Sequence, residues 1–134
     1  AKLFDNLLVA VAVNSSKPTM FDLHDRLKLV EIVSSRYPNV NFGSYEGLTI
    51  DFANTHNTNV IVRGVRNSSD FNYESQIAQM NNTMDKALES IFFIASDPFK
   101  SITSSLVRQV ISLNGDYSKF ISKDVANHLE KIKK

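Results

Sequence analysis

Three short apolar runs constrain the fold of this chain most strongly. Residues 7–13 read Leu-Leu-Val-Ala-Val-Ala-Val, and shorter runs follow at 60–62 and 91–94. Unbroken apolar character over a few residues is typical of strands that are covered on both faces, as in a parallel sheet. A weaker and shorter strand is expected at 40–42. The runs therefore predict a parallel sheet.

Between these runs, apolar residues recur at the spacing of amphipathic helices. Helical stripes are expected at 23–30, 77–88, 106–111 and 125–132, with Asp22 and Ser122 capping the first and last, and a short helix at 48–53. Strands that alternate with helices predict an α/β fold. We expect one domain over residues 1–134, a Rossmann-like parallel sheet with helices on both faces. Ligands of such sheets bind beyond the carboxyl ends of the strands.

Composition and charge exclude several classes of function. The 134 residues fit one domain, and the formal net charge of +1 provides no global field for nucleic acid or an anionic membrane, so neither partner is expected. The absence of cysteine excludes disulfides and thiolate metal sites, and it fits a reducing cytoplasm. No two histidines stand at ligand spacing; His24 and His128 are expected on exposed helix faces.

Basic residues follow the first and third predicted strands. Lys17 lies in a Ser-rich loop, and Arg63-Gly64-Val65-Arg66 leaves the run at 60–62. Glycine lets a ligand approach the backbone, and arginine pairs with phosphate oxygens through two parallel hydrogen bonds. The alternative for the lysine is an ordinary surface position. For the arginines, it is ion pairing with Asp70 or Glu74.

Two helix starts complete the candidate anion site. Asp70 and Glu74 open one helix, where acidic residues complement the helix dipole and where Glu74 also suits a ribose or adenine contact. After the run at 91–94, hydroxyl residues and a lysine surround the start of another helix. Free backbone N–H groups at such a start favour an anion site, although plain capping is the alternative.

Taken together, the lysine loop, the Arg-Gly-Val-Arg turn, the Asp-Phe-x-Tyr-Glu helix start and the Ile-Thr-Ser-Ser-Leu-Val-Arg segment resemble bacterial phosphopantetheine adenylyltransferases of the nucleotidylyltransferase superfamily. The resemblance covers essentially the whole chain. It implies transfer of AMP from ATP to 4′-phosphopantetheine, giving dephospho-coenzyme A and pyrophosphate in coenzyme A biosynthesis. It also implies Mg²⁺ with the ATP, a cytoplasmic location and a homohexamer.

The resemblance further implies roles for individual residues, with no residue expected to ligate a metal. Lys17 and Arg66 would act on the reacting phosphates. The acceptor would be held by Lys17, Thr49, Arg63, Ile77, Met80 and Asn81. ATP would be held by Gly64, Val65, Arg66, Tyr73, Glu74, Phe99, Lys100, Ser101, Ile102, Thr103, Ser104 and Ser105.

The sequence departs from the family pattern in small and large ways. Val65 replaces a leucine, Thr49 replaces a residue that is often apolar, and Thr103 stands in a serine triplet. The family's first strand and its Gly-x-Phe-Asp-Pro-x-Thr-x-Gly-His segment, with the histidine that stabilises the transition state, have no counterpart. Residues 1–5 resemble the end of the helix that would follow. We therefore expect an N-terminally incomplete domain and, for this chain alone, no activity.

The loss of a central strand explains that expectation. Each orphaned buried backbone group costs about 1–3 kcal/mol, against a net stability of about 5–15 kcal/mol for a whole domain. Three other functions stay open: a sister nucleotidylyltransferase with another phosphorylated acceptor, an inactive nucleotide-binding module, and an interaction domain without a ligand.

Overall fold

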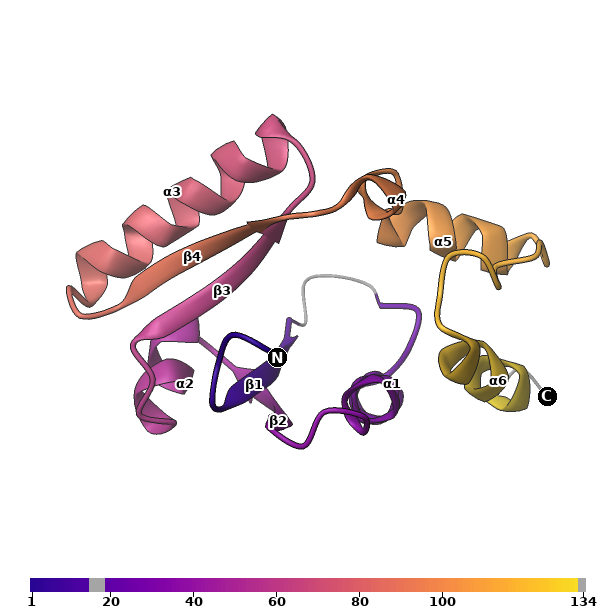
Figure 1. Cartoon of the computed structure of the whole chain (residues 1–134), viewed down its shortest axis with the longest axis horizontal. Helices are drawn as coiled ribbons and strands as arrows, with labels where there is room; N and C mark the ends of the chain where they lie inside the picture. Colours follow the sequence, from indigo (N-terminus) through magenta and orange to yellow (C-terminus); the bar gives the residue numbers. More distant parts are fainter. Residues whose placement is uncertain (15–18, 133–134) are drawn as a thin grey trace. The chain divides into compact units, whose positions relative to one another are not determined.

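The computed structural model describes residues 1–14 and 19–132 (Figure 1). Parallel strands alternate with helices, which confirms the α/β prediction. The elements are β1 (Leu7–Val13), α1 (Leu23–Ser34), β2 (Val40–Glu46), α2 (Thr49–Thr55), β3 (Val60–Val65), α3 (Ser68–Met84), β4 (Glu89–Ile94), α4 (Asp97–Lys100), α5 (Ser104–Ser112) and α6 (Lys123–Ile132). The chain divides into two compact units, a first unit of residues 1–46 and 104–134 and a second unit of residues 47–103.

The first unit is built on a β1–α1–β2 crossover. β1 and β2 pair in parallel from Leu7↔Val40 to Val13↔Glu46. β2 is longer than expected, because it pairs along the whole of β1. The Arg26 guanidinium donates to the Ala12 carbonyl oxygen at 3.1 Å and so ties α1 to the end of β1.

Helix caps in the first unit agree with the sequence. The Asp22 carboxylate accepts from the backbone N–H of Asp25 at 2.8 Å, and Ser122 Oγ accepts from that of Val125 at 3.4 Å. α6 packs against α1, and Arg36 donates to Asp124 across this contact at 2.9 Å. His128 of α6 was expected to be exposed, but its Nε2 is enclosed. The prediction failed because the stripe alone does not reveal how much of α6 its neighbours cover.

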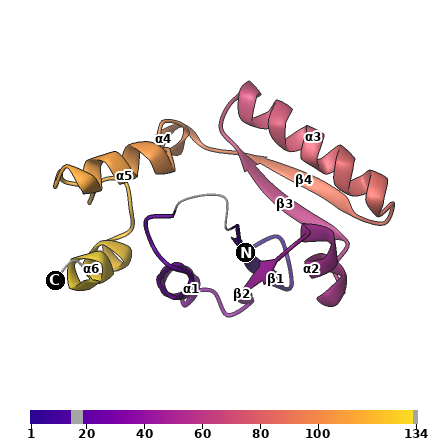
Figure 2. The ribbon, with the colours of Figure 1, turned by 180° about the vertical axis from the view of Figure 1, so that it is seen from behind.

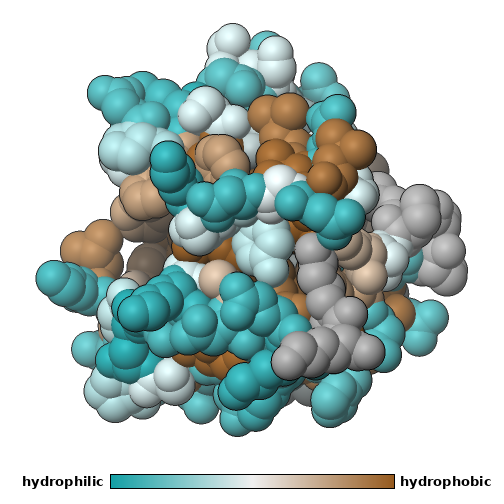
Figure 3. Space-filling view, turned by 90° about the vertical axis from the view of Figure 1, so that its right-hand side faces the viewer, coloured by the Kyte–Doolittle hydropathy of each residue, from teal (hydrophilic) through white to brown (hydrophobic). Residues whose placement is uncertain are grey.

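The second unit pairs β3 with β4 in parallel, from Val60↔Glu89 to Val65↔Ile94. α3 lies along this pair in both ribbon views (Figure 1, Figure 2). The rings of Phe71 on α3 and Phe92 on β4 meet edge to face, with centroids 5.3 Å apart. Successive strand residues alternate between faces, so Phe93 points away from α3. Its side chain is 40% exposed, and other apolar side chains also remain at the molecular surface (Figure 3).

The core of the second unit lies where α2 meets the strands. Ile50, Ala53 and Leu88 are buried together, with Ile61 packed against them. The expected helical stripe included Leu88, which was wrong, because α3 ends at Met84. Leu88 instead enters the core from the connection to β4, where its carbonyl oxygen accepts from the Asn82 amide at 3.3 Å.

Two further observations bear on the expected single sheet. Within residues 1–14 and 19–132, four strands form two separate two-stranded sheets, one in each unit, so the prediction of one domain over residues 1–134 stays a prediction. Residues 1–5 were expected to end a helix but form a turn instead, held by the Asn39 amide, which donates to the carbonyl oxygens of Ala1 and Phe4. Among the helices of the described residues, none has both the length and the apolarity to cross a membrane.

Candidate active site

The carboxyl ends of β3 and β4 form one edge in the second unit. Val65 pairs with Ile94, and the backbone N–H of Ala95 donates to the Val65 carbonyl oxygen at 2.9 Å, so the two strands end together. Arg66 follows β3 at this edge, and the segment containing α4 follows β4. The parallel pairing therefore brings together two stretches that the sequence predicted as parts of an ATP site.

Arg66 is held at this edge by several hydrogen bonds. Its Nε donates to Asp70 Oδ2 at 2.7 Å and its Nη2 to Asp70 Oδ1 at 3.2 Å. Its Nη1 donates to the carbonyl oxygen of Ile102 at 3.3 Å. The guanidinium thus joins the end of β3, the first turn of α3 and the loop that follows α4.

The hydrogen bonds between Arg66 and Asp70 also change their proton affinities. The pKa of Asp70 is lowered, first by the side-chain hydrogen bonds from Arg66, then by the Arg66 backbone N–H and positive charge, while partial burial opposes the change. The pKa of Arg66 is raised for the complementary reasons. The pair is therefore ionised at neutral pH.

Arg63 makes a looser contact. Its Nε lies 3.5 Å from Glu74 Oε2, and the two side chains are 33% and 22% exposed. Oε2 is enclosed and accepts no hydrogen bond from any described residue, so the contact is one of charge alone. Both arginines therefore make the acidic pairs that the sequence offered as an alternative, which by itself neither requires nor prevents phosphate binding.

The segment after β4 is largely exposed. Lys100 donates to Asp97 within α4 at 2.7 Å, and the Phe99 side chain is exposed. Ser101 follows α4, Ile102 is tied to Arg66, and Thr103 ends the second unit. Ser104 and Ser105 open α5 in the first unit, where Arg108 donates to Ser105 Oγ at 3.2 Å.

The residues expected to hold the acceptor lie on two helices of the second unit. Thr49 is the first residue of α2, and Ile77, Met80 and Asn81 lie on α3. Met80 is 64% exposed, whereas Asn81 is only 8% exposed, so these neighbours face different surroundings. Lys17 lies outside the described residues.

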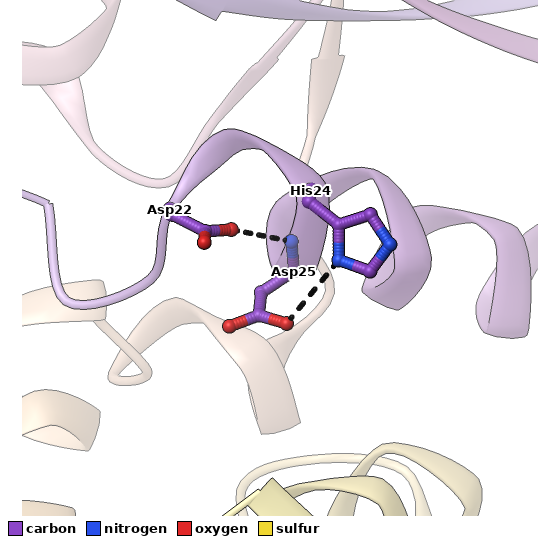
Figure 4. Close-up of side chains that lie close together, drawn as sticks. All are labelled: Asp22, His24 and Asp25. Carbon is purple, nitrogen blue, oxygen red and sulfur yellow. Dashed lines mark hydrogen bonds and ion pairs between the residues drawn. The ribbon is translucent and has the colours of Figure 1, made fainter.

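Two other features of the first unit are a cluster of potential metal ligands and a cavity. Asp22, His24 and Asp25 form the only cluster of potential metal ligands within the described part of the chain (Figure 4), but Asp22 is occupied as a helix cap. A cavity of about 220 Å³ is lined by Met20, Phe21, Asp25, Ile111, Leu129 and Ile132, none of which the sequence assigned to the site.

Comparisons with known proteins decide the family. The cytidylyltransferase-like family matches residues 1–110. The phosphopantetheine adenylyltransferase of Lachnoclostridium phytofermentans is 39% identical over 125 residues, covering 93% of this chain and 77% of the relative. The chain belongs to the phosphopantetheine adenylyltransferase family. Family members of the same name from Clostridium perfringens and Burkholderia vietnamiensis are 38% and 41% identical, over 97% and 98% of this chain and 79% and 81% of their own lengths.

Membership of the phosphopantetheine adenylyltransferase family confirms the resemblance drawn from the sequence motifs. It does not test the individual site residues, whose roles stay predictions. The sequence assigned no site role to Asp70 and gave Ile102 only a place among the nucleotide contacts. The signal for Asp70 was its position four residues after Arg66 at a helix start; the bond from Arg66 to the Ile102 carbonyl left no signal in the sequence.

Proposed function

We propose that this protein transfers the adenylyl group of ATP to 4′-phosphopantetheine, giving dephospho-coenzyme A and pyrophosphate. Family membership supports the reaction. The structural observation that supports this reaction most directly is that Arg66 contacts Asp70 and Ile102 at the shared carboxyl edge of β3 and β4. A fixed guanidinium at that edge is suited to the phosphates of a nucleotide.

The chemistry is an in-line displacement at the α-phosphorus of ATP. An oxygen of the acceptor phosphate forms the new bond, and the bond from the α-phosphorus to the oxygen that bridges to the β-phosphate breaks. Pyrophosphate leaves with that oxygen. The attacking phosphate is already an anion at neutral pH, so the reaction needs alignment and positive charge more than a general base.

On the nucleotide side, we assign Arg66 to the phosphates of ATP. A guanidinium has five N–H donors, and three are engaged by Asp70 and Ile102, which leaves two without a partner among the described residues. These two donors match a pair of phosphate oxygens. Gly64 supports close approach, since no atom lies within 4 Å of the position where a Cβ would stand.

On the acceptor side, we assign Arg63, with Lys17, to the phosphate of 4′-phosphopantetheine. Arg63 has one acidic neighbour at 3.5 Å and no hydrogen bond to it, so a phosphate can replace Glu74 as its partner. Thr49, Ile77, Met80 and Asn81 are assigned to the pantetheine arm.

A divalent metal is expected to accompany ATP, and we propose Mg²⁺. Asp70 and Glu74 are already paired with arginines, so these carboxylates do not form a cage for an ion. Mg²⁺ is commonly held by substrate phosphates and water. The metal would therefore enter as part of the MgATP substrate.

We propose that residues 1–134 belong to one domain whose sheets take up a further strand. The described residues give each unit a two-stranded sheet, whereas parallel sheets are normally covered on both faces and have more strands. The chain covers 77–81% of the lengths of these relatives, so the relatives are longer than this chain. Intact-mass measurement of the natural protein tests the proposal; a mass of 15.1 kDa for a folded, active sample would refute it.

For the assembly and location, we propose a cytoplasmic homo-oligomer, with the hexamer that the family resemblance implies. Light scattering on the eluted peak of a sizing column measures the assembly directly. A monomer at micromolar concentration would contradict it.

The proposed reaction is tested by incubating the purified protein with MgATP and 4′-phosphopantetheine and measuring pyrophosphate and dephospho-coenzyme A. Nicotinamide mononucleotide and a phosphoalcohol serve as competing acceptors; a preference for either would favour a sister nucleotidylyltransferase. Calorimetric titration separates binding from turnover, so binding of both substrates without pyrophosphate release would indicate an inactive nucleotide-binding module. Arg63→Ala is expected to lose acceptor binding and keep ATP binding.

A further inference from the structure

We propose that Asp70 is a positioning residue that fixes the guanidinium of Arg66, which also bonds the loop after α4, for the nucleotide phosphates. The inference rests on the proposed function, because it assumes that Arg66 binds ATP. It goes further by assigning a task to a carboxylate that touches no substrate.

The position of Asp70 in its helix carries the first step. Asn67 is the N-cap of α3, and its side chain accepts from the backbone N–H of Asp70 at 2.8 Å, as in a capping box. In such a box, the acidic side chain three residues into the helix normally reaches back to the N–H of the cap residue. Asp70 reaches one residue further, to the backbone N–H of Arg66 at 3.2 Å. Its carboxylate is therefore directed at Arg66.

The geometry of the contact carries the second step. Asp70 accepts from two different nitrogens of one guanidinium, at 2.7 and 3.2 Å, so the plane of that group is fixed. The remaining bond, from Nη1 to the Ile102 carbonyl oxygen at 3.3 Å, fixes the third side. A single ion pair restrains the position of a charge, whereas these three hydrogen bonds also restrain the orientation of the guanidinium plane.

The effect on binding follows from the order that this arrangement provides. A free arginine side chain loses rotamer freedom when it binds a phosphate, which weakens binding about 3- to 10-fold for each side chain that must be ordered. Asp70 orders Arg66 before the nucleotide arrives. Its negative charge opposes this gain by weakening the attraction between Arg66 and phosphate, so the sign of the net effect is itself the test.

Asp70→Asn is the first variant, because an amide keeps one acceptor for the Arg66 backbone and loses the charged two-point contact. We expect its calorimetric dissociation constant for MgATP to rise about 3- to 10-fold. Adenosine, which lacks phosphates, is expected to bind the variant and the wild type equally. Equal or tighter MgATP binding would overturn the proposal, and so would equal weakening of MgATP and adenosine, which indicates a purely structural role.

Asp25→Asn provides a matched control. Asp25 has the same position in α1 as Asp70 in α3, with the Asp22 cap accepting from its backbone N–H. Its carboxylate lies 3.8 Å from His24 Nδ1 (Figure 4), and it pairs with no arginine of the described residues. The control is expected to bind MgATP as the wild type does. A loss equal to that of Asp70→Asn would show that the effect does not depend on the contact with Arg66, and it would overturn the proposal.

A double-mutant cycle isolates the route through Arg66. Arg66→Ala is expected to weaken MgATP binding about 10- to 100-fold, and adding Asp70→Asn should change that value by less than about 2-fold. Additive losses would overturn the proposal. If Asp70→Asn fails to fold, Arg66→Lys replaces it, since an ammonium keeps the charge without the fixed fork; wild-type affinity in that variant would be equally decisive. Failure of the wild type to bind MgATP would instead remove the proposed function, and this inference with it.

Discussion

Arg63→Ala is predicted to destabilise the protein because it leaves the carboxylate of Glu74 without its partner. Arg63 Nε is the only cation next to Glu74 Oε2 within the described residues, at 3.5 Å, and that oxygen is enclosed without a hydrogen bond. Removal of the guanidinium therefore leaves a carboxylate that is poorly hydrated and uncompensated.

The exposure of the pair sets the magnitude. Fully exposed ion pairs contribute about 0–1 kcal/mol, whereas removal of one partner from a fully buried pair costs about 3–5 kcal/mol. The Arg63 and Glu74 side chains are 33% and 22% exposed, between these cases. We expect the free energy of unfolding to fall by about 1–3 kcal/mol, which leaves a domain of ordinary stability folded. Glu74→Gln alone should lose less than about 1 kcal/mol, because the arginine that remains can reach water.

Urea unfolding followed by far-UV circular dichroism measures these changes. Arg36→Ala is the matched control: Arg36 pairs with Asp124 at 2.9 Å, both side chains are more than half exposed, and the loss should stay below about 1 kcal/mol. The double variant Arg63→Ala/Glu74→Gln should be more stable than Arg63→Ala, because the stranded charge is gone. The reasoning fails if Arg63→Ala loses no more than the control, or if the double variant shows no recovery.

Three further predictions concern the second unit. Leu88→Ala should lower the free energy of unfolding by about 2–5 kcal/mol in urea, because Leu88 is 2% exposed, whereas Met84→Ala, at a half-exposed site, should change it by less than about 0.5 kcal/mol. Gly64→Ala should leave stability unchanged or slightly higher, because the Cβ enters open space, while calorimetry should show weaker ATP binding; unchanged affinity would argue against a close backbone contact. The pKa of Asp70 is lowered in the fold, so its contribution to stability is complete above the unfolded pKa of about 4 and disappears as the pH falls through the lower folded value. Urea titrations from pH 5 to about pH 2 should accordingly show a flatter pH dependence for Asp70→Asn than for the wild type.

The sequence predicted much of the local structure because local physics determines it. The apolar run at 7–13 became β1 with the same bounds, and both expected caps, Asp22 and Ser122, accept the hydrogen bonds that define a helix start. Leu88 could not be placed in the same way. Its spacing continues the stripe of α3, and only the tertiary position of α2 explains why it lies in the core beyond the helix end.

For the candidate site, the sequence identified the residues but not their pairing. Arginines near Asp70 and Glu74 offered two uses, for phosphate or for surface ion pairs, and spacing does not distinguish them. In the fold, Arg66 pairs with Asp70 and Arg63 with Glu74. The N–H donors of Arg66 that these contacts and Ile102 do not engage can still bind phosphate. The bond to the Ile102 carbonyl was beyond prediction, because a backbone carbonyl is identical at every residue.

The two arginines of the Arg-Gly-Val-Arg turn therefore differ in how firmly the fold holds each guanidinium, although the side chains are chemically the same. Arg66 is held by three guanidinium hydrogen bonds, so releasing it would break several contacts at once. Arg63 is held by one charge contact of 3.5 Å without a hydrogen bond, so a phosphate has only this one contact to replace. In an adenylyl transfer, this difference suits a fixed cation for the nucleotide and an exchangeable one for the acceptor. Glu74 would then pair with Arg63 only while the acceptor site is empty, so the guanidinium has an anionic partner both before and after the acceptor binds.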